Sequence, residues 1–201
     1  MKNTPLWSET ADGAKRPAMS RRELLAGMTA CGWLLMEGRR ARAAPVGALE
    51  IESFDAQGRS LGLTRLEPVR KSAGQWRRQL SPLAFQVTRE AGTERPFSGE
   101  YWNNHAAGLY RCICCGTALY DSRTKFESGT GWPSFWMPIS PHNVSASEDT
   151  SLFMTRTAIA CRLCEAHLGH VFNDGPKPTG LRYCMNSVAL QFVPLVRKAA
   201  A

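Results

Sequence analysis

A single cysteine near the C-terminus has polar neighbours that could activate it. In the segment 181–193, Cys184 alternates with Arg182 and Asn186, so in a strand these three side chains would share one face. A cation on that face favours the thiolate and lowers a thiol pKa that is ordinarily about 8.5. Because the thiolate is the nucleophilic form, the pattern predicts a reactive cysteine; a buried strand cysteine beside a solvent-facing arginine is the alternative. The same face would continue with apolar side chains, Val188, Leu190 and Phe192.

Two histidines precede this cysteine. His167 and His170 follow Cys164 closely in the chain. Imidazoles titrate near neutrality, so two of them held beside a thiolate could donate and accept protons. Taken singly, either histidine also fits an ordinary hydrogen-bonded loop residue.

The segment 129–136 places aromatic planes on a turn stiffened by proline. Trp132 follows Gly131 and precedes a proline. A rigid aromatic plane makes a suitable wall for a small apolar group. Core packing is the alternative, above all for Phe135 and Trp136.

Two Cys-x-x-Cys pairs predict a metal site. Cys112 and Cys115 form the first pair, and Cys161 and Cys164 form the second. One tight turn can place both sulfurs of a pair about 2.3 Å from the same ion, and Gly116 suits the left-handed exit from the first turn. Four thiolates leave no open coordination position, so we expect one structural Zn²⁺ that holds two hairpin turns together.

Other interpretations of the cysteine pairs are open. One ion could be bound by Cys161, Cys164, His167 and His170, which would leave the first pair without a role. The pairs could also be redox-active dithiols, although such a motif normally opens a helix in an alternating strand and helix pattern that this chain lacks.

The elements that position these residues must be short, because turn signals are dense after Trp76. The stretches 151–160 and 181–193 are typical of strands, and long helical periodicity is absent. A short helix is expected at 80–89 or at 101–107. The fold class predicted from this pattern is mainly β and antiparallel, with few short helices. Residues 46–74 carry only a weak pattern.

Charge and length exclude several classes of protein. The 201 residues are sufficient for one domain with a hydrophobic core. A formal charge of +8 would suit a nucleic acid or a membrane surface, but residues 1–44 hold eight basic and four acidic side chains and so account for half of it. We therefore expect no nucleic-acid partner.

The first 44 residues are typical of a targeting segment. Ser-Arg-Arg-Glu-Leu-Leu at 20–25, an apolar stretch at 24–36 and small residues before Pro45 resemble a twin-arginine export signal, with Cys31 as part of its apolar stretch. The stretch is shorter than the roughly 20 residues that span a bilayer, so we expect no permanent membrane anchor. The expected location of the protein is therefore the periplasm. The alternative to an export signal is a soluble N-terminal helix.

Residues 76–193 resemble the peptide-methionine (R)-S-oxide reductases, the B-type methionine sulfoxide reductases. The resemblance rests on motifs at 92–99, 112–116, 125–135, 167–180 and 182–187. It implies two antiparallel sheets in a β-tent-like fold, a zinc knuckle pair at one end and an active site on the other side of the sheets. The chain would then comprise an export signal (1–44), an N-terminal extension (45–75) and a monomeric reductase domain (76–195).

The resemblance also implies a role for each matching residue. Cys184 would attack the sulfoxide sulfur of a methionine-R-sulfoxide in an oxidised protein or peptide, release methionine and become a sulfenic acid. Trp132 would hold the ε-methyl group, and His167 and His170 would position and protonate the sulfoxide oxygen. The remaining polar residues of the site would be Arg182 and Asn186.

One position departs from the family pattern. Many members carry a resolving cysteine between the glycines of the Gly-x-Gly-Trp-Pro turn, where this chain has Thr130. We therefore expect an external, thioredoxin-like thiol to reduce the sulfenic acid directly, since the remaining Cys114 lies in the zinc knuckle. A non-catalytic zinc-ribbon binding module and a Cys-His hydrolase or acyltransferase are the alternative functions.

Overall fold

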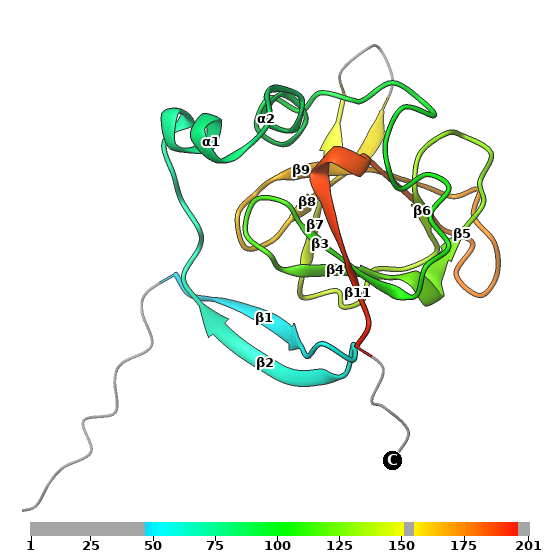
Figure 1. Ribbon diagram of the computed structural model, residues 1–201, viewed down its shortest axis with the longest axis horizontal. Helices are drawn as coiled ribbons and strands as arrows, with labels where there is room; N and C mark the ends of the chain where they lie inside the picture. The colour runs from blue at the N-terminus through cyan, green and yellow to red at the C-terminus, as the bar shows by residue number, and fades with distance from the viewer. Residues whose placement is uncertain (1–46, 151–154, 197–201) are drawn as a thin grey trace, which may run out of the picture. The chain divides into compact units, whose positions relative to one another are not determined.

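Antiparallel sheets form the framework of the residues that the computed structural model describes, 47–150 and 155–196 (Figure 1). These residues all fall within one compact unit, 42–201. The predicted export signal at 1–44, with its Cys31, lies outside the described residues. Among the described helices, none is long and apolar enough to cross a membrane.

The largest sheet has six strands in the order β5-β6-β10-β9-β8-β7, each antiparallel to its neighbours. A second sheet has three antiparallel strands in the order β11-β3-β4. The mainly β prediction is thus confirmed. The strands of the larger sheet are β5 (Lys125–Phe126), β6 (Ser134–Phe135), β7 (Val144–Asp149), β8 (Arg156–Cys161), β9 (His167–Phe172) and β10 (Arg182–Met185). Those of the smaller sheet are β3 (Gly108–Cys112), β4 (Ala118–Asp121) and β11 (Leu190–Pro194).

Aromatic rings fill the core between these sheets. Tyr110 of β3, Tyr120 of β4 and Phe135 of β6 are fully buried. The Phe135 ring stacks on Tyr120 at a centroid distance of 4.4 Å and meets the edge of Tyr110 at 5.0 Å. Phe135 is therefore a core residue, as its packing interpretation predicted, and these rings hold the two sheets face to face.

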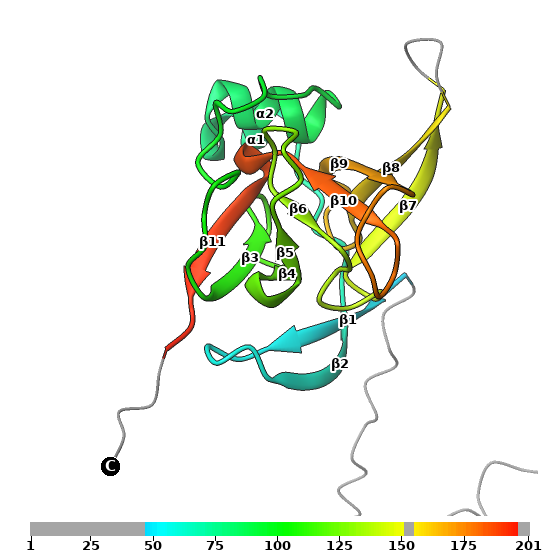
Figure 2. The same cartoon turned by 90° about the vertical axis from the view of Figure 1, so that its right-hand side faces the viewer.

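Residues 49–66 form an antiparallel hairpin of β1 (Leu49–Phe54) and β2 (Ser60–Leu66), which the weak sequence pattern did not predict. Ile51 is buried in the common core. The fully buried Asn143 side chain accepts from the Glu52 N–H and donates to the Glu52 carbonyl, both at 2.8 Å. The hairpin is therefore fastened to the sheets, and Figures 1 and 2 show it at the end of the unit opposite the helices.

Two short helices precede the sheets. Helix α1 (Ala73–Gln79) begins at Ser72 with a capping box, and α2 (Pro82–Arg89) begins at the N-cap Ser81 with proline in its first turn. The short helix expected at 80–89 or at 101–107 lies at the first of these places, as α2, while 101–107 contains turns and loop. Helix α1 was not predicted.

The segment 181–193 is two strands rather than one. After β10 the chain makes a short 3-10 turn, η3 (Ser187–Ala189), and then enters β11 in the other sheet. Figure 2 shows β10 and β11 diverging from this turn. The prediction that one face runs from Arg182 through Cys184 to Phe192 is therefore wrong beyond residue 185, since the turn ends the alternation. The other predicted strand, 151–160, corresponds to β8 from residue 156, and residues 151–154 lie outside the described part.

A β-bulge determines which face of β9 carries the histidines. In β8, Ala158 pairs with His170 and Ala160 pairs with His167, so the two histidines, three apart in β9, oppose residues only two apart in β8. Since Ala158 and Ala160 share a face, His167 and His170 share it too, and their rings lie 5.2 Å apart between centroids. Gly169 makes this possible, because a Cβ there would lie 2.1 Å from the Cys184 carbonyl oxygen.

Candidate functional site

A row of polar side chains crosses the six-stranded sheet at its centre. In the strand register, Cys184 of β10 pairs with Ser134 of β6 on one side and with His170 of β9 on the other. Directly opposed residues of antiparallel strands place their side chains on the same face. The register therefore brings together the predicted nucleophile and one of the predicted proton donors.

Hydroxyl groups surround the cysteine on its β6 side. The Cys184 sulfur lies 3.9 Å from the Thr130 hydroxyl, which lies 2.8 Å from the Ser128 hydroxyl. Ser134 in turn donates to Ser128 at 2.7 Å. Thr130, at the position where many family members have a resolving cysteine, thus begins a chain of hydroxyls that contacts the sulfur.

The predicted lowering of the Cys184 pKa is wrong in its net direction. Burial raises the pKa of this thiol, and the opposing contributions of Thr130, Arg182 and Ser134 are smaller. The sulfur of Cys184 is therefore protonated in the free protein at neutral pH. Arg182 exerts the predicted influence, but desolvation outweighs it.

Arg182 is committed to an ion pair. Its guanidinium donates to both carboxylate oxygens of Asp174, at 2.9 and 2.8 Å, and packs over the Phe172 ring at 4.4 Å. Asp174 holds the Arg182 pKa above its ordinary value. This fixed geometry keeps the cation on the Cys184 face of β10 while the acid neutralises much of its charge.

The two histidines differ in their surroundings. The His170 Nε2 lies 2.7 Å from an Asp149 carboxylate oxygen, and Arg156 donates to the same oxygen at 2.8 Å. Within the described residues, the buried Nε2 of His167 has no hydrogen-bond partner. Burial, and secondarily the nearby His170, lower the pKa of His167 to about 4, so this ring is neutral at physiological pH. The His170 imidazole is thus oriented by Asp149, whereas the His167 Nε2 remains available to hydrogen-bond another group.

Trp132 and Asn186 meet at a third residue, Glu94. The Trp132 indole N–H donates to the Glu94 carbonyl at 3.2 Å, and the Asn186 side-chain oxygen accepts from the Glu94 N–H at 2.9 Å. The Asn186 side-chain amide also donates to the Leu168 carbonyl at 3.0 Å. Asn186 is buried, and its side-chain amide forms these hydrogen bonds inside the protein. They tie the strand that carries Cys184 to the strand that carries His167.

The four predicted ligands converge. The sulfurs of Cys112, Cys115, Cys161 and Cys164 lie within 4.8 Å of one another, with Cys112 to Cys164 at 3.6 Å and Cys115 to Cys161 at 3.5 Å. A tetrahedron with metal–sulfur bonds of about 2.3 Å has edges of about 3.8 Å, so the set fits a Zn²⁺ ion. This is the structural zinc site of the chain, and it joins the β3–β4 turn of one sheet to the β8–β9 turn of the other.

The two knuckle turns share a conformation. Gly116 has a φ of +78°, as its predicted role in the exit from the turn requires, and Glu165 occupies the equivalent position at +58°. The N–H of Gly116 donates to the Cys112 carbonyl, and that of Glu165 to the Cys161 carbonyl, both at 2.8 Å. Both pairs therefore have the conformation needed to bind one metal. The alternative ligand set of Cys161, Cys164, His167 and His170 is not formed, since His170 binds Asp149.

Both helices brace the knuckles. Gln79 at the end of α1 donates to the Cys114 carbonyl at 2.7 Å, and Arg89 at the end of α2 donates to the Cys164 carbonyl at 2.8 Å. Cys114 itself is buried and lies outside the four-cysteine set.

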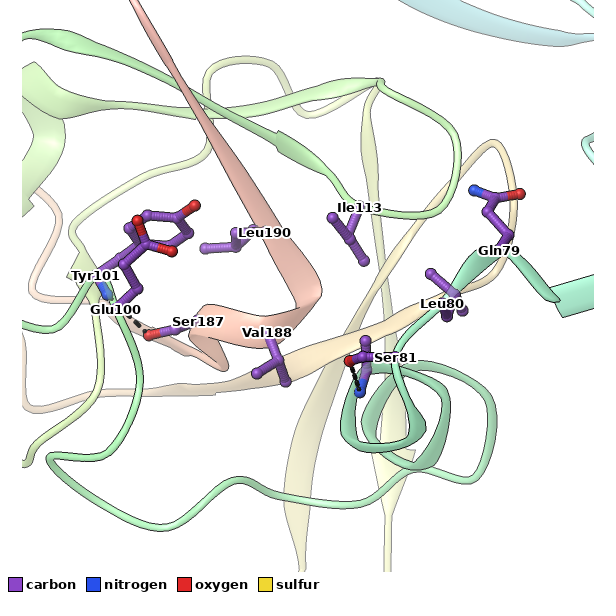
Figure 3. Close-up of a pocket in the computed structure, with 10 residues that line it drawn as sticks. Gln79, Leu80, Ser81, Glu100, Tyr101, Ile113, Ser187, Val188 and Leu190 are labelled. Atoms are coloured by element: carbon purple, nitrogen blue, oxygen red, sulfur yellow. Dashed lines mark hydrogen bonds between the residues drawn. The ribbon is translucent and has the colours of Figure 1, made fainter. Parts of the chain in front are cut away.

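A pocket of about 300 Å³ lies behind the η3 turn, lined by Leu80, Tyr101 and Val188 among others (Figure 3). Its lining comes from α1, α2 and the β10–β11 connection, and it includes neither Cys184 nor Trp132. Figure 3 shows Ser187 pointing toward the Tyr101 backbone, whose N–H donates to the Ser187 hydroxyl at 3.2 Å. This pocket is therefore separate from the predicted chemistry.

Several contact residues escaped sequence reasoning. Asp174 belonged to a turn signal, Asp149 lay just before the stretch expected to be a strand at 151–160, and Glu94 lay inside a motif of the family resemblance without an assigned role. Only the presence of an acid in a motif could have drawn attention to Glu94, because its partners are about 40 and 90 residues distant.

Comparison with known proteins shows the family to which the chain belongs. The SelR domain matches residues 80–194, which is more than half of the chain and includes every predicted site residue. The chain belongs to the SelR family. The resemblance drawn from its motifs is thereby confirmed at the level of the family.

The relatives carry a common name. Peptide methionine sulfoxide reductase MsrB of Synechococcus sp. strain RCC307 is 55% identical over 126 residues, covering 63% of this chain and 93% of that protein. MsrB of Thioalkalivibrio sulfidiphilus is 57% identical over 116 residues, covering 58% and 85%. The chloroplastic peptide methionine sulfoxide reductase B1 of Arabidopsis thaliana is 54% identical over 121 residues, covering 60% and 59%.

The zinc site makes a testable prediction about stability. The substitution Cys161→Ser removes one of the four zinc ligands. The variant should therefore lose its zinc and at least about 3 kcal/mol of unfolding free energy. Metal content by mass spectrometry and thermal unfolding measure both effects. The matched control is Cys114→Ala, which alters a neighbouring buried cysteine and should keep one zinc per chain. Full zinc occupancy in the Cys161→Ser protein would contradict the four-cysteine site.

Proposed function

We propose that this SelR-family chain reduces the R epimer of methionine sulfoxide in oxidised proteins and peptides, with Cys184 as the nucleophile. The thiol sulfur attacks the sulfoxide sulfur and takes over its oxygen, giving a Cys184 sulfenic acid and a methionine thioether. The substrate sulfur gains two electrons and the cysteine sulfur loses two, so the step balances with no other reductant. The MsrB relatives support the reaction, and the site geometry supports the assignment of residues.

The observation that carries this proposal is the unpartnered Nε2 of His167 on the face that bears Cys184 and His170. A sulfoxide oxygen is a strong hydrogen-bond acceptor and a poor leaving group until it is protonated. In the proposed mechanism, the neutral His167 donates to that oxygen. His170, oriented by Asp149, exchanges the proton that the Cys184 thiol must release.

The remaining residues complete the proposed binding mode. Trp132 packs against the ε-methyl group, opposite the imidazoles that hold the oxygen, so only one sulfur epimer fits. Arg182 provides the positive charge that favours the thiolate once substrate excludes water, and Asn186 holds the strands of Cys184 and His167 in register.

We further propose that an external, thioredoxin-like thiol reduces the sulfenic acid directly. The first thiol forms a mixed disulfide with Cys184 and releases water, and a second thiol then frees the enzyme. Cys114 is buried beside the zinc ligands, and Thr130 contacts Cys184 with a hydroxyl that cannot form a disulfide.

An assay with both sulfoxide epimers tests the function. The mature protein, incubated with dithiothreitol and peptides carrying either epimer, should consume only the R form, and Cys184→Ser should abolish this consumption. Chiral chromatography of the peptides is the measurement. Consumption of neither epimer would defeat the reductase and favour a binding module, while cleavage of an ester or amide would favour a hydrolase.

The Thr130 position tests the route of reduction. Because Thr130 already contacts the Cys184 sulfur, T130C should condense with the sulfenic acid and give an intramolecular disulfide after one turnover without added thiol. Mass spectrometry should show this disulfide in T130C, but a dimedone-reactive sulfenic acid in the wild type and in the control T130S. A wild-type enzyme without any trappable sulfenic acid would contradict direct reduction.

We also propose that residues 1–44 direct export to the periplasm, that 45–75 form an extension and that 76–195 form the reductase domain. The observations behind this proposal are the paired arginines, the short apolar stretch and the small residues before Pro45. Fractionation should find a shortened chain in the periplasm, and R21K/R22K should retain the full-length chain inside the cell. Full-length wild-type protein confined to the cytosol would overturn the assignment.

A further inference from the structure

Glu94 places a carboxylate inside the protein, against the turn that follows the catalytic strand. The residue is 2% exposed. Its two carboxylate oxygens accept the backbone N–H groups of Ser187 at 2.7 Å and Val188 at 3.0 Å. These are the first residues of η3, where the chain leaves the six-stranded sheet for the other sheet. At the start of a helical turn these N–H groups have no acceptor within the turn, and the Glu94 side chain accepts both of them.

The backbone of Glu94 contacts two predicted site residues at the same time. Its N–H donates to the Asn186 side chain, and its carbonyl accepts the Trp132 indole N–H. Trp132 and Asn186 come from different parts of the chain, and Glu94 is the described residue that hydrogen-bonds to both. Its carboxylate thus fixes a backbone segment that in turn fixes the indole ring.

Close packing leaves this junction little freedom. A Cβ on Gly99 would lie 2.5 Å from a Glu94 carboxylate oxygen and 2.3 Å from the Ser187 hydroxyl. The loop that carries Glu94 also reaches the turn that bears Trp132, because the Phe97 N–H donates to the Gly131 carbonyl at 2.8 Å. Movement of the carboxylate would therefore be transmitted to the Trp132 turn.

We propose that Glu94 is the positioning residue that sets the distance between the Trp132 ring and the Cys184 sulfur, and hence the size of the alkyl group accepted on the substrate sulfur. The inference rests on the proposed function, in which Trp132 holds the ε-methyl group. Glu94 acts on one side through the turn that ends the Cys184 strand and on the other through the indole N–H. With this distance fixed, a methyl group fits and a longer alkyl group is excluded.

The size preference of the enzyme tests this role. Wild type should reduce peptides with methionine-R-sulfoxide much faster than otherwise identical peptides with the S-ethyl homologue. In Glu94→Gln, the amide NH₂ opposes a backbone N–H, so one of the two bonds is lost and the Trp132 turn is released. We expect kcat/KM for the methyl substrate to fall about 10- to 100-fold, and the methyl-over-ethyl preference to fall about tenfold. Trp132→Phe should likewise reduce the preference for the methyl over the ethyl substrate.

Controls separate positioning from folding. Glu100→Gln changes an exposed acid of the same loop and should leave both rates unchanged. Zinc content and the unfolding temperature report the folded fraction of each variant. A purely structural role would lower kcat/KM for both substrates equally and would preserve the ratio between them. If Glu94→Gln does not fold, Glu94→Asp, which retains the charge but shortens the reach, carries the same comparison.

Three outcomes would overturn the proposal: an unchanged methyl-over-ethyl ratio in a folded variant, a changed ratio in Glu100→Gln, or failure of both Glu94 variants to fold. The last would assign Glu94 to the fold alone. Absence of R-sulfoxide reduction by the wild type would defeat the proposed function itself, and so is distinguishable from failure of the Glu94 inference.

Discussion

The coordination of four thiolates by zinc is the constraint on which the arrangement of the two sheets depends. Two ligands come from the β3–β4 turn of the three-stranded sheet and two from the β8–β9 turn of the six-stranded sheet, so the metal fastens the sheets at one end. Strand β9 begins three residues beyond the last ligand, at His167. Because a metal site fixes its ligands within tenths of an ångström, it also fixes where β9 starts and how it pairs with β10. The zinc thus bears on the proposed site through this geometry.

A second constraint lies where the chain passes from one sheet to the other. Strand β10 carries Cys184 in the six-stranded sheet, and after η3 the chain continues as β11 beside β3. Crossing between sheets interrupts the ladder and leaves backbone N–H groups without strand partners, and the buried Glu94 carboxylate satisfies two of them. The strands that carry the proposed site residues are thus tied at two points, the zinc site and the Glu94 junction.

Burial favours the neutral forms of two of the proposed reacting groups, Cys184 and His167, before substrate binds. Arg182 is paired with Asp174, and His170 lies against the Asp149 carboxylate, while burial raises the Cys184 pKa and lowers that of His167. Under the proposed function the substrate sulfoxide is itself neutral, so these neutral groups would suit a dipole rather than an ion. Charge would then develop only as the sulfur–oxygen bond breaks, at the place where imidazoles can supply a proton.

The sequence by itself determined the fold class and the four cysteines of the zinc site. Spacing alone paired the four zinc cysteines, since two residues between thiolates imply one turn, and the dense turn signals required short antiparallel strands. Local patterns, however, cannot register events that involve distant residues. The bulge that puts His167 and His170 on one face and the break that ends the Cys184 strand after Met185 depend on strand pairing. The partners of Glu94 depend on how its loop packs against distant segments. The net pKa of Cys184 was also decided only in the tertiary structure, because desolvation depends on everything packed around the sulfur, whereas sequence shows only the nearest charge.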